Sequence, residues 1–201
     1  MIEMLKKLNN QFHNKAFSKY GEDVKSLGWG SKESQNIRFR VLLEVGVEDG
    51  QSVLDVGCGF GDFYDFLLSQ NINVDYVGVD INKNFIKVAK QKNKSVIFHL
   101  SDTSSFSNDS FDWVVASGIF SFDCNEWLDD TKKTLKEMFL ISRKGIAINF
   151  LSSHTPFQKQ SGFKHVELNM LFDLIKIFTN KFVLRHDYKA NDITAYMYKE
   201  T

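Results

Sequence analysis

The sequence has no net charge, and this absence narrows the classes of partner that it can bind. Its 25 lysine and arginine residues are balanced by 25 aspartate and glutamate residues. Proteins that bind nucleic acid usually carry an excess of basic residues, because contacts with phosphates supply most of their affinity. We therefore expect no nucleic-acid partner, and a small molecule is the more natural ligand.

Cysteines and long apolar runs are also scarce. The two cysteines, Cys58 and Cys124, form no CxxC pair, so we do not expect a secreted domain stapled by disulfides. No stretch approaches the roughly 18 apolar residues that span a bilayer, and the start of the chain lacks the apolar run of a signal peptide. The five histidines lack metal-ligand spacing such as HxxxH. These absences predict a cytoplasmic protein with no membrane partner and no bound metal, and they leave the oligomeric state unknown.

What the chain does contain is a regular alternation of β-branched runs and helical periodicity from residue 51 onward. Strands are predicted at residues 53–56, 75–79, 96–100, 111–116, 145–150, 182–186 and 193–198. Helices are predicted between them at residues 62–69, 83–92, 126–141 and 167–179. Such an alternation indicates βαβ units and a mostly parallel sheet. The last connection is too short for a crossover helix, so the final strand should run antiparallel.

Two helices are predicted before the first strand. Residues 1–20 have apolar side chains at helical spacing, and Ser31 is a suitable N-cap for a second helix that Gly46 and Gly50 end. The sequence has no internal repeat, low-complexity segment or linker. We therefore expect residues 1–201 to form a single α/β domain.

Four features follow the first four strands of the predicted sheet, where ligands bind in open α/β folds. Residues 57–61 form a glycine-rich turn that allows close approach of the backbone to a ligand. Asp80 closes the second strand and suits the two hydroxyls of a ribose. Asp102 closes the third strand, placed to accept from an adenine amine, and residues 116–118 are small enough to leave room for a reacting centre.

Two nucleotide cofactors compete for this arrangement. A dinucleotide needs G-x-G-x-x-G with its pyrophosphate at the start of the helix, but here the spacing is G-x-G-x-G and Asp62 replaces the third glycine. The carboxylate of Asp62 would repel a pyrophosphate at that place. S-adenosylmethionine (SAM) has no phosphate and is cationic, and Asp55 can help to hold its cationic end. The negative charge of these aspartates and the spacing of the glycines both favour SAM.

On these residues the chain resembles the class I SAM-dependent methyltransferases over nearly its whole length. The four matching motifs are residues 53–61, 77–80, 101–102 and 111–118. Residues 26–35, with Arg38 and Phe39, are similar to a group of small bacterial methyltransferases of mostly unassigned substrate. The resemblance implies a Rossmann-like fold with a seven-stranded, mostly parallel sheet in the order 3-2-1-4-5-7-6, the last strand antiparallel and helices on both faces.

The resemblance also implies that residues 1–46 form a helical cap over the cofactor, and that residues 47–201 form the core. Arg38 or Trp29 would then contact the carboxylate or thioether end of SAM, although a surface arginine and a packing tryptophan are equally consistent with the sequence. SAM is the expected cofactor and S-adenosylhomocysteine its product. The predicted cofactor site comprises Trp29, Gly30, Arg38, Asp55, Gly57, Cys58, Gly59, Asp62, Asp80, Ile81, Asp102, Thr103 and Ser117.

Methyl transfer depends mainly on positioning, and a hydroxyl acceptor also needs a general base. His154, after the fifth strand, is the first candidate for that base, and the other candidates are Tyr188, after the sixth strand, and Asp123, after the fourth. We expect a small acceptor methylated at oxygen. The resemblance, with a composition rich in Lys, Asn and Phe, points to an intermediate of bacterial surface-polysaccharide modification, such as a sugar hydroxyl or phosphoramidate. The alternatives are an NAD-type oxidoreductase and a non-catalytic SAM-binding protein.

Overall fold

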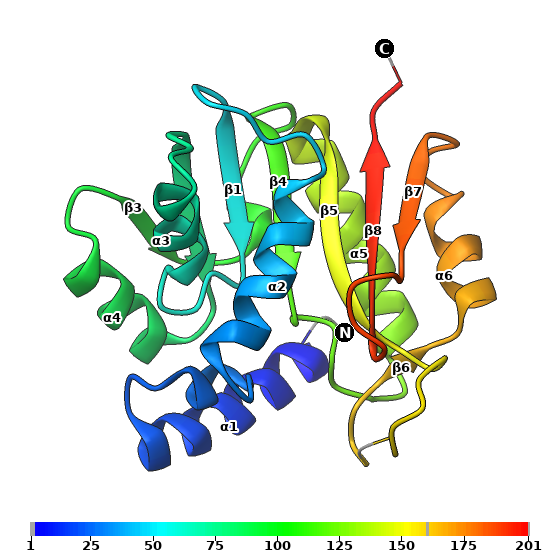
Figure 1. The fold of residues 1–201 in the computed structure, drawn as a ribbon, viewed down its shortest axis with the longest axis horizontal. Helices are drawn as coiled ribbons and strands as arrows, with labels where there is room; N and C mark the ends of the chain where they lie inside the picture. Colours follow the sequence, from blue (N-terminus) through cyan, green and yellow to red (C-terminus); the bar gives the residue numbers. More distant parts are fainter. Residues whose placement is uncertain (1–2, 160, 201) are drawn as a thin grey trace.

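The computed structural model describes residues 3–159 and 161–200, and it places one twisted sheet between helices (Figure 1). The strands are β1 Ser52–Val56, β2 Asp75–Asp80, β3 Ile97–Leu100, β4 Phe111–Ser117, β5 Ser142–Ser152, β6 His165–Val166, β7 Phe182–Arg185 and β8 Asp192–Tyr198. The helices are α1 Glu3–Tyr20, α2 Lys32–Leu43, α3 Asp62–Ser69, α4 Lys83–Lys92, α5 Trp127–Ile141 and α6 Leu168–Ile175, with short 3₁₀ turns η1 Val24–Leu27 and η2 Thr103–Ser105. Within the described residues, no helix combines the length and the apolar character that crossing a membrane requires.

The strand order confirms the predicted Rossmann-like fold. The sheet runs β3-β2-β1-β4-β5-β8-β7, and β8 is antiparallel to both of its neighbours. The two-residue strand β6 pairs with β5 outside this path, and without it the order reads 3-2-1-4-5-7-6. A strand of two residues has no periodicity to detect, which is why the sequence did not predict it.

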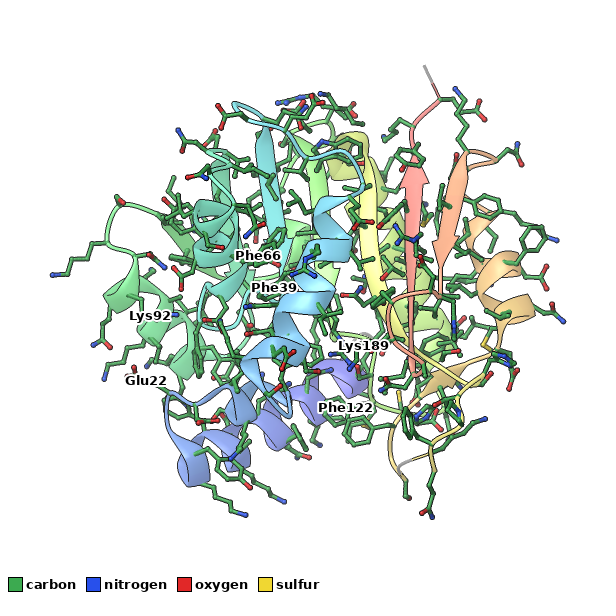
Figure 2. The ribbon with its side chains drawn as sticks, in the orientation of Figure 1. Glu22, Phe39, Phe66, Lys92, Phe122 and Lys189 are labelled. Atoms are coloured by element: carbon green, nitrogen blue, oxygen red, sulfur yellow. The ribbon has the colours of Figure 1, made fainter. Side chains whose placement is uncertain are left out.

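The sheet is buried on both faces, so its central strands are apolar on both sides. In β1, Val53 packs in the core beneath α2 and α3, whereas its neighbour Leu54 packs in the core beneath α5 and α6. Figure 1 shows α2 in front of the sheet and α5 behind it. Phe39 of α2 and Phe66 of α3 lie together over the front face, with ring centroids 5.8 Å apart (Figure 2).

The predicted N-cap residue of the second helix is confirmed. Ser31 caps α2 by accepting from the amide of Ser34 at 3.1 Å. Helix α6 ends at Ile175, earlier than the predicted residue 179. Thr179 bonds to the sheet instead of extending the helix: its hydroxyl donates to the carbonyl of Tyr198, the last residue of β8, at 2.8 Å and accepts from the amide of Lys181, just before β7, at 3.0 Å.

Helix α1 crosses the sheet beyond the carboxyl ends of β1 and β4 (Figure 1). Polar contacts connect it to the core. Asn9 donates to the carbonyl of Ile119 at 3.4 Å, and Asn14 accepts from Asn82 at 3.0 Å. Helix α2 instead packs on the sheet and is tied to β8 by a buried ion pair, in which Arg38 donates to both carboxylate oxygens of Asp192 at 3.1 and 2.6 Å. The cap over the site is thus mainly α1.

We expect Arg38→Met to lower the free energy of unfolding by about 3 kcal/mol, because it leaves the carboxylate of Asp192 buried without its cation. Urea unfolding measures this difference. Arg40→Met, at an exposed position of the same helix, is the matched control and should change stability little. Equal effects of the two substitutions would show that the ion pair does not anchor α2.

Candidate active site

A cavity lies beyond the carboxyl ends of β1, β2 and β4, beneath α1. The cap helix contributes Lys6, Asn9 and His13 to its wall. Many of the predicted cofactor residues also line it, namely Trp29, Asp55, Gly57, Cys58, Gly59, Asp80, Ile81, Asp102, Thr103 and Ser117. Segments far apart in the sequence therefore meet at one place, as parallel strands with a common edge require.

The conformation of the turn between β1 and α3 depends on glycine, as Gly57 and Gly59 illustrate. Gly57 and Gly59 have φ angles of +78° and +56°, in the left-handed region that favours glycine. A Cβ atom at Gly57 would collide with Ile119, and one at Gly59 would lie 2.9 Å from Leu27 Cδ2. The amide of Gly57 donates to the carbonyl of Val79 at 2.8 Å, so the turn is held against the end of β2.

Asp80 closes β2 and is held by backbone amides. Its Oδ2 accepts from the amide of Gly59 at 3.0 Å, and its Oδ1 accepts from the amide of Asn82 at 2.7 Å. Burial raises the pKa of Asp80 to about 6, although these bonds oppose the shift. Each carboxylate oxygen keeps a further lone pair, so Asp80 can accept from two neighbouring hydroxyls.

Asp55 lies in β1, beside β2, and also carries a desolvated carboxylate. The hydroxyl of Tyr76 donates to its Oδ2 at 2.6 Å. Burial, opposed by this bond and assisted by the charges of Asp80 and Asp62, raises the pKa of Asp55 to about 7. A cation in the cavity would lower the pKa values of Asp55 and Asp80, so this pair favours a cationic ligand.

Asp102 follows β3 and contacts both the core and the cap. Its Oδ1 accepts from the amide of Ser104 at 2.9 Å, and Lys6 of α1 forms an ion pair with its Oδ2. Burial acts to raise the pKa of Asp102, but the bonds from Lys6 and Ser104 lower it to about 2. Asp102 is therefore ionised at physiological pH, and its neighbour Thr103 donates to Glu137 of α5.

The charges on the cavity wall suit SAM better than a dinucleotide. Among the described residues that line the cavity, Asp55, Asp80 and Asp102 are acidic and Lys6 is basic. SAM carries an ammonium and a sulfonium group, which this wall attracts, whereas a pyrophosphate would meet charges of its own sign. The residues present therefore fit SAM. Asp80 would hold its ribose and Asp102 its adenine amine.

Comparisons with known proteins agree with this chemistry. Residues 54–139 match the family described as a methyltransferase domain. The candidate methyltransferase Rv1506c of Mycobacterium tuberculosis is 29% identical over 161 residues, which cover 77% of this chain and 97% of that protein. The chain is a class I SAM-dependent methyltransferase.

Solved methyltransferases share the fold at low sequence identity. A SAM-dependent methyltransferase of Leishmania major has a TM-score of 0.72 and 12% identity, covering 97% of this chain and 83% of that chain. A phosphoethanolamine N-methyltransferase of Haemonchus contortus, solved with S-adenosylhomocysteine, has a TM-score of 0.60 and 20% identity, covering 78% and 39%. The family assignment replaces the oxidoreductase alternative. The described residues contain no group of three or more candidate metal ligands, and a metal-free enzyme stays a prediction.

The lining of the methyltransferase's cavity, as far as the chain is described, leaves out three predicted cofactor residues: Gly30, Arg38 and Asp62. The guanidinium of Arg38, which pairs with Asp192, lies 4.5 Å from the ring centroid of Trp29. The Trp29 ring in turn covers Gly118, where a Cβ atom would lie 3.0 Å from it. Arg38 therefore contacts Trp29, which lines the cavity, and is not itself among the described lining residues.

The three predicted bases of the methyltransferase lie elsewhere in the described structure. His154 faces His186, with ring centroids 5.8 Å apart, at a separate pocket. Tyr188 shares a 2.7 Å hydrogen bond with Thr194. Asp123 is exposed and pairs with Lys164 at 3.4 Å. None of the three predicted bases is among the described residues that line the main cavity.

His13 is the histidine among the described residues of the cavity wall, and the sequence did not single it out. It follows Leu5 and Asn9 at intervals of four residues, so all three lie on one face of α1. Asn9 and His13 are polar residues on the same helix face as the buried Leu5, and this pattern could have indicated that they face the interior. The signal was missed because the position of α1 over the strands depends on tertiary packing.

We expect Asp55→Asn to stabilise the free methyltransferase at pH 8 by on the order of 2 kcal/mol and to weaken S-adenosylhomocysteine binding. Burial raises the folded-state pKa of Asp55 to about 7 from the ordinary value of 3.8. The wild type should therefore lose stability as the pH rises from about 4 to about 7, where the folded state retains a proton that the unfolded state has released. Urea unfolding at pH 5 and pH 8, with calorimetric titration of S-adenosylhomocysteine, measures both effects.

Asp75→Asn, at the exposed start of β2, is the control for this substitution. It should alter neither the pH dependence of unfolding nor the affinity. If Asp55→Asn instead destabilised the protein at pH 8, the carboxylate would already have a stabilising partner in the free enzyme, and the cation-binding role of Asp55 would be wrong.

Proposed function

We propose that this methyltransferase transfers the methyl group of SAM to a hydroxyl oxygen of a small-molecule acceptor. The observation that carries the proposal is His13, a neutral base on the cavity wall. Its Nδ1 lies 2.9 Å from the carbonyl oxygen of Ser26. Because a carbonyl only accepts, the proton resides on Nδ1, and Nε2 keeps its lone pair.

The environment of His13 keeps the imidazole neutral. Burial lowers its pKa below 6.5, and the bond to Ser26 opposes the shift only in part. Aromatic rings surround it: the centroids of Phe12, Phe85 and Phe122 lie 5.2, 5.3 and 6.2 Å away. Figure 2 shows Phe122 beside α1. A neutral imidazole with a free nitrogen, in an apolar surrounding, suits proton removal from a hydroxyl.

The chain's own residues supply binding and proton transfer, and SAM, when bound, supplies an activated methyl group. Asp80, Asp102 and the glycine turn would hold the cofactor, and His13 would take the acceptor's proton. Helix α1 covers the cavity, which supports a small acceptor. We include a sugar hydroxyl or phosphoramidate of a bacterial surface polysaccharide among the proposed acceptors, on the sequence resemblance and composition alone.

The test is transfer of label from methyl-labelled SAM to a panel of sugars, sugar phosphoramidates and cell metabolites, followed by mass spectrometry. Phosphoethanolamine belongs in the panel, because the Haemonchus contortus neighbour is a phosphoethanolamine N-methyltransferase. Labelled product at a hydroxyl oxygen supports the proposal. Label on an amine acceptor, with none on any hydroxyl, would contradict it.

With an identified acceptor, we expect His13→Gln to lower kcat by about 100-fold or more, because glutamine cannot accept the proton. At saturating SAM, wild-type turnover should fall as the pH drops through the lowered pKa of His13, below 6.5. His154→Gln is the matched control, since His154 was the base predicted from sequence. A large loss in the His154 variant and none in the His13 variant would reverse the assignment.

A further inference from the structure

Gln35 has a buried polar atom that the described structure leaves without a partner. The side chain comes from α2, is 2% exposed and lines the cavity. Its Oε1 has no hydrogen-bond partner among the described residues. Buried acceptors are nearly always satisfied, so an unsatisfied one beside a cavity calls for a ligand that donates to it.

Asp62 determines which end of the Gln35 amide faces the cavity. Gln35 Nε2 donates to Asp62 Oδ2 at 3.1 Å. Burial acts to raise the pKa of Asp62, but Lys92 at 2.9 Å and Lys32 at 3.1 Å lower it overall, so the carboxylate stays ionised and can only accept. A flipped amide would place two acceptors against each other. Oε1 therefore lies on the side of the amide away from Asp62; Asp62 is not among the described residues of the cavity wall, whereas Gln35 lines it.

The cavity near Gln35 is selective for a positively charged donor. Asp55 lines the same cavity, and its pKa is raised partly by the charge of Asp62, which places the three side chains in one neighbourhood. A carboxylate ligand would meet the Asp55 carboxylate and an amide oxygen, and both would repel it. An ammonium group would satisfy both, because it carries the opposite charge and three N–H donors.

We propose that Gln35 binds the cofactor through Oε1, which accepts a hydrogen bond from the ammonium group of the methionine part of SAM while Asp55 supplies the opposing charge. Asp62 is then a positioning residue that acts through Gln35. This inference rests on the assignment to the SAM-dependent methyltransferases, and it is independent of the acceptor.

The test compares two ligands by calorimetric titration: S-adenosylhomocysteine, which has the ammonium group, and 5′-methylthioadenosine, which lacks the whole amino-acid part. Gln35→Met keeps the length of the side chain and removes the acceptor. We expect it to weaken S-adenosylhomocysteine binding by about 10-fold or more and to leave 5′-methylthioadenosine binding unchanged. Equal losses for both ligands, or no loss for either, would overturn the proposal.

Asp62→Asn provides a second, independent variant. The amide of the introduced asparagine can donate to Gln35 Oε1, so the Gln35 amide is no longer fixed in one orientation. We expect the same ligand-selective loss. Asp65→Asn is the matched control, because Asp65 also contacts Lys92, at 2.9 Å, without touching Gln35. If Gln35→Met does not fold, the Asp62 and Asp65 variants decide the question. If the wild type binds neither ligand, the cofactor assignment fails instead.

Discussion

Two buried carboxylates at the ends of adjacent strands dominate the physics of this site. Asp55 and Asp80 lie where β1 and β2 reach the glycine turn, and desolvation raises the pKa values of both, to about 7 and about 6. The hydroxyl of Tyr76 and the backbone amides at Gly59 and Asn82 orient these side chains without neutralising them. Such charge is costly in an empty site and favourable beside a cation, so the fold retains at this place a preference for a positively charged ligand.

The position of the cap helix α1 also depends on a carboxylate of the site. Helix α1 meets the core through polar contacts at Lys6, Asn9 and Asn14 as well as through the buried side chain of Leu5. One of these contacts, Lys6 with Asp102, uses a carboxylate assigned to the adenine amine. A cofactor that donates to Asp102 therefore competes with the cap helix or shares the carboxylate with it, which couples cofactor binding to the position of α1.

Much of this arrangement could be predicted from sequence because it depends on local pattern. The glycine turn, Asp80 and Asp102 each follow a strand whose β-branched run is visible in the chain, and parallel strands bring their ends together without further information. The length of α6 was overestimated because Thr179, instead of extending the helix, bonds to Tyr198, nineteen residues later. A contact at that distance along the chain leaves no trace in helical periodicity.

The residues that were harder to place from sequence are charged side chains near the site. Such a side chain can contact the ligand itself, or it can hold another residue that does. Arg38 and Asp62 were both assigned to the cofactor, and the structure gives them the partners Asp192 and Gln35. Arg38 and Asp192 are 154 residues apart in sequence, so no spacing rule could pair them. Once its charge is paired, such a residue orients its neighbour and no longer presents a free charge to the cavity. The residues free to recognise a ligand are then Gln35, whose Oε1 has no partner among the described residues, and Asp55, whose carboxylate is desolvated and bonded to the Tyr76 hydroxyl without an opposing charge. Only the folded structure distinguishes these two residues from the residues that hold them in place.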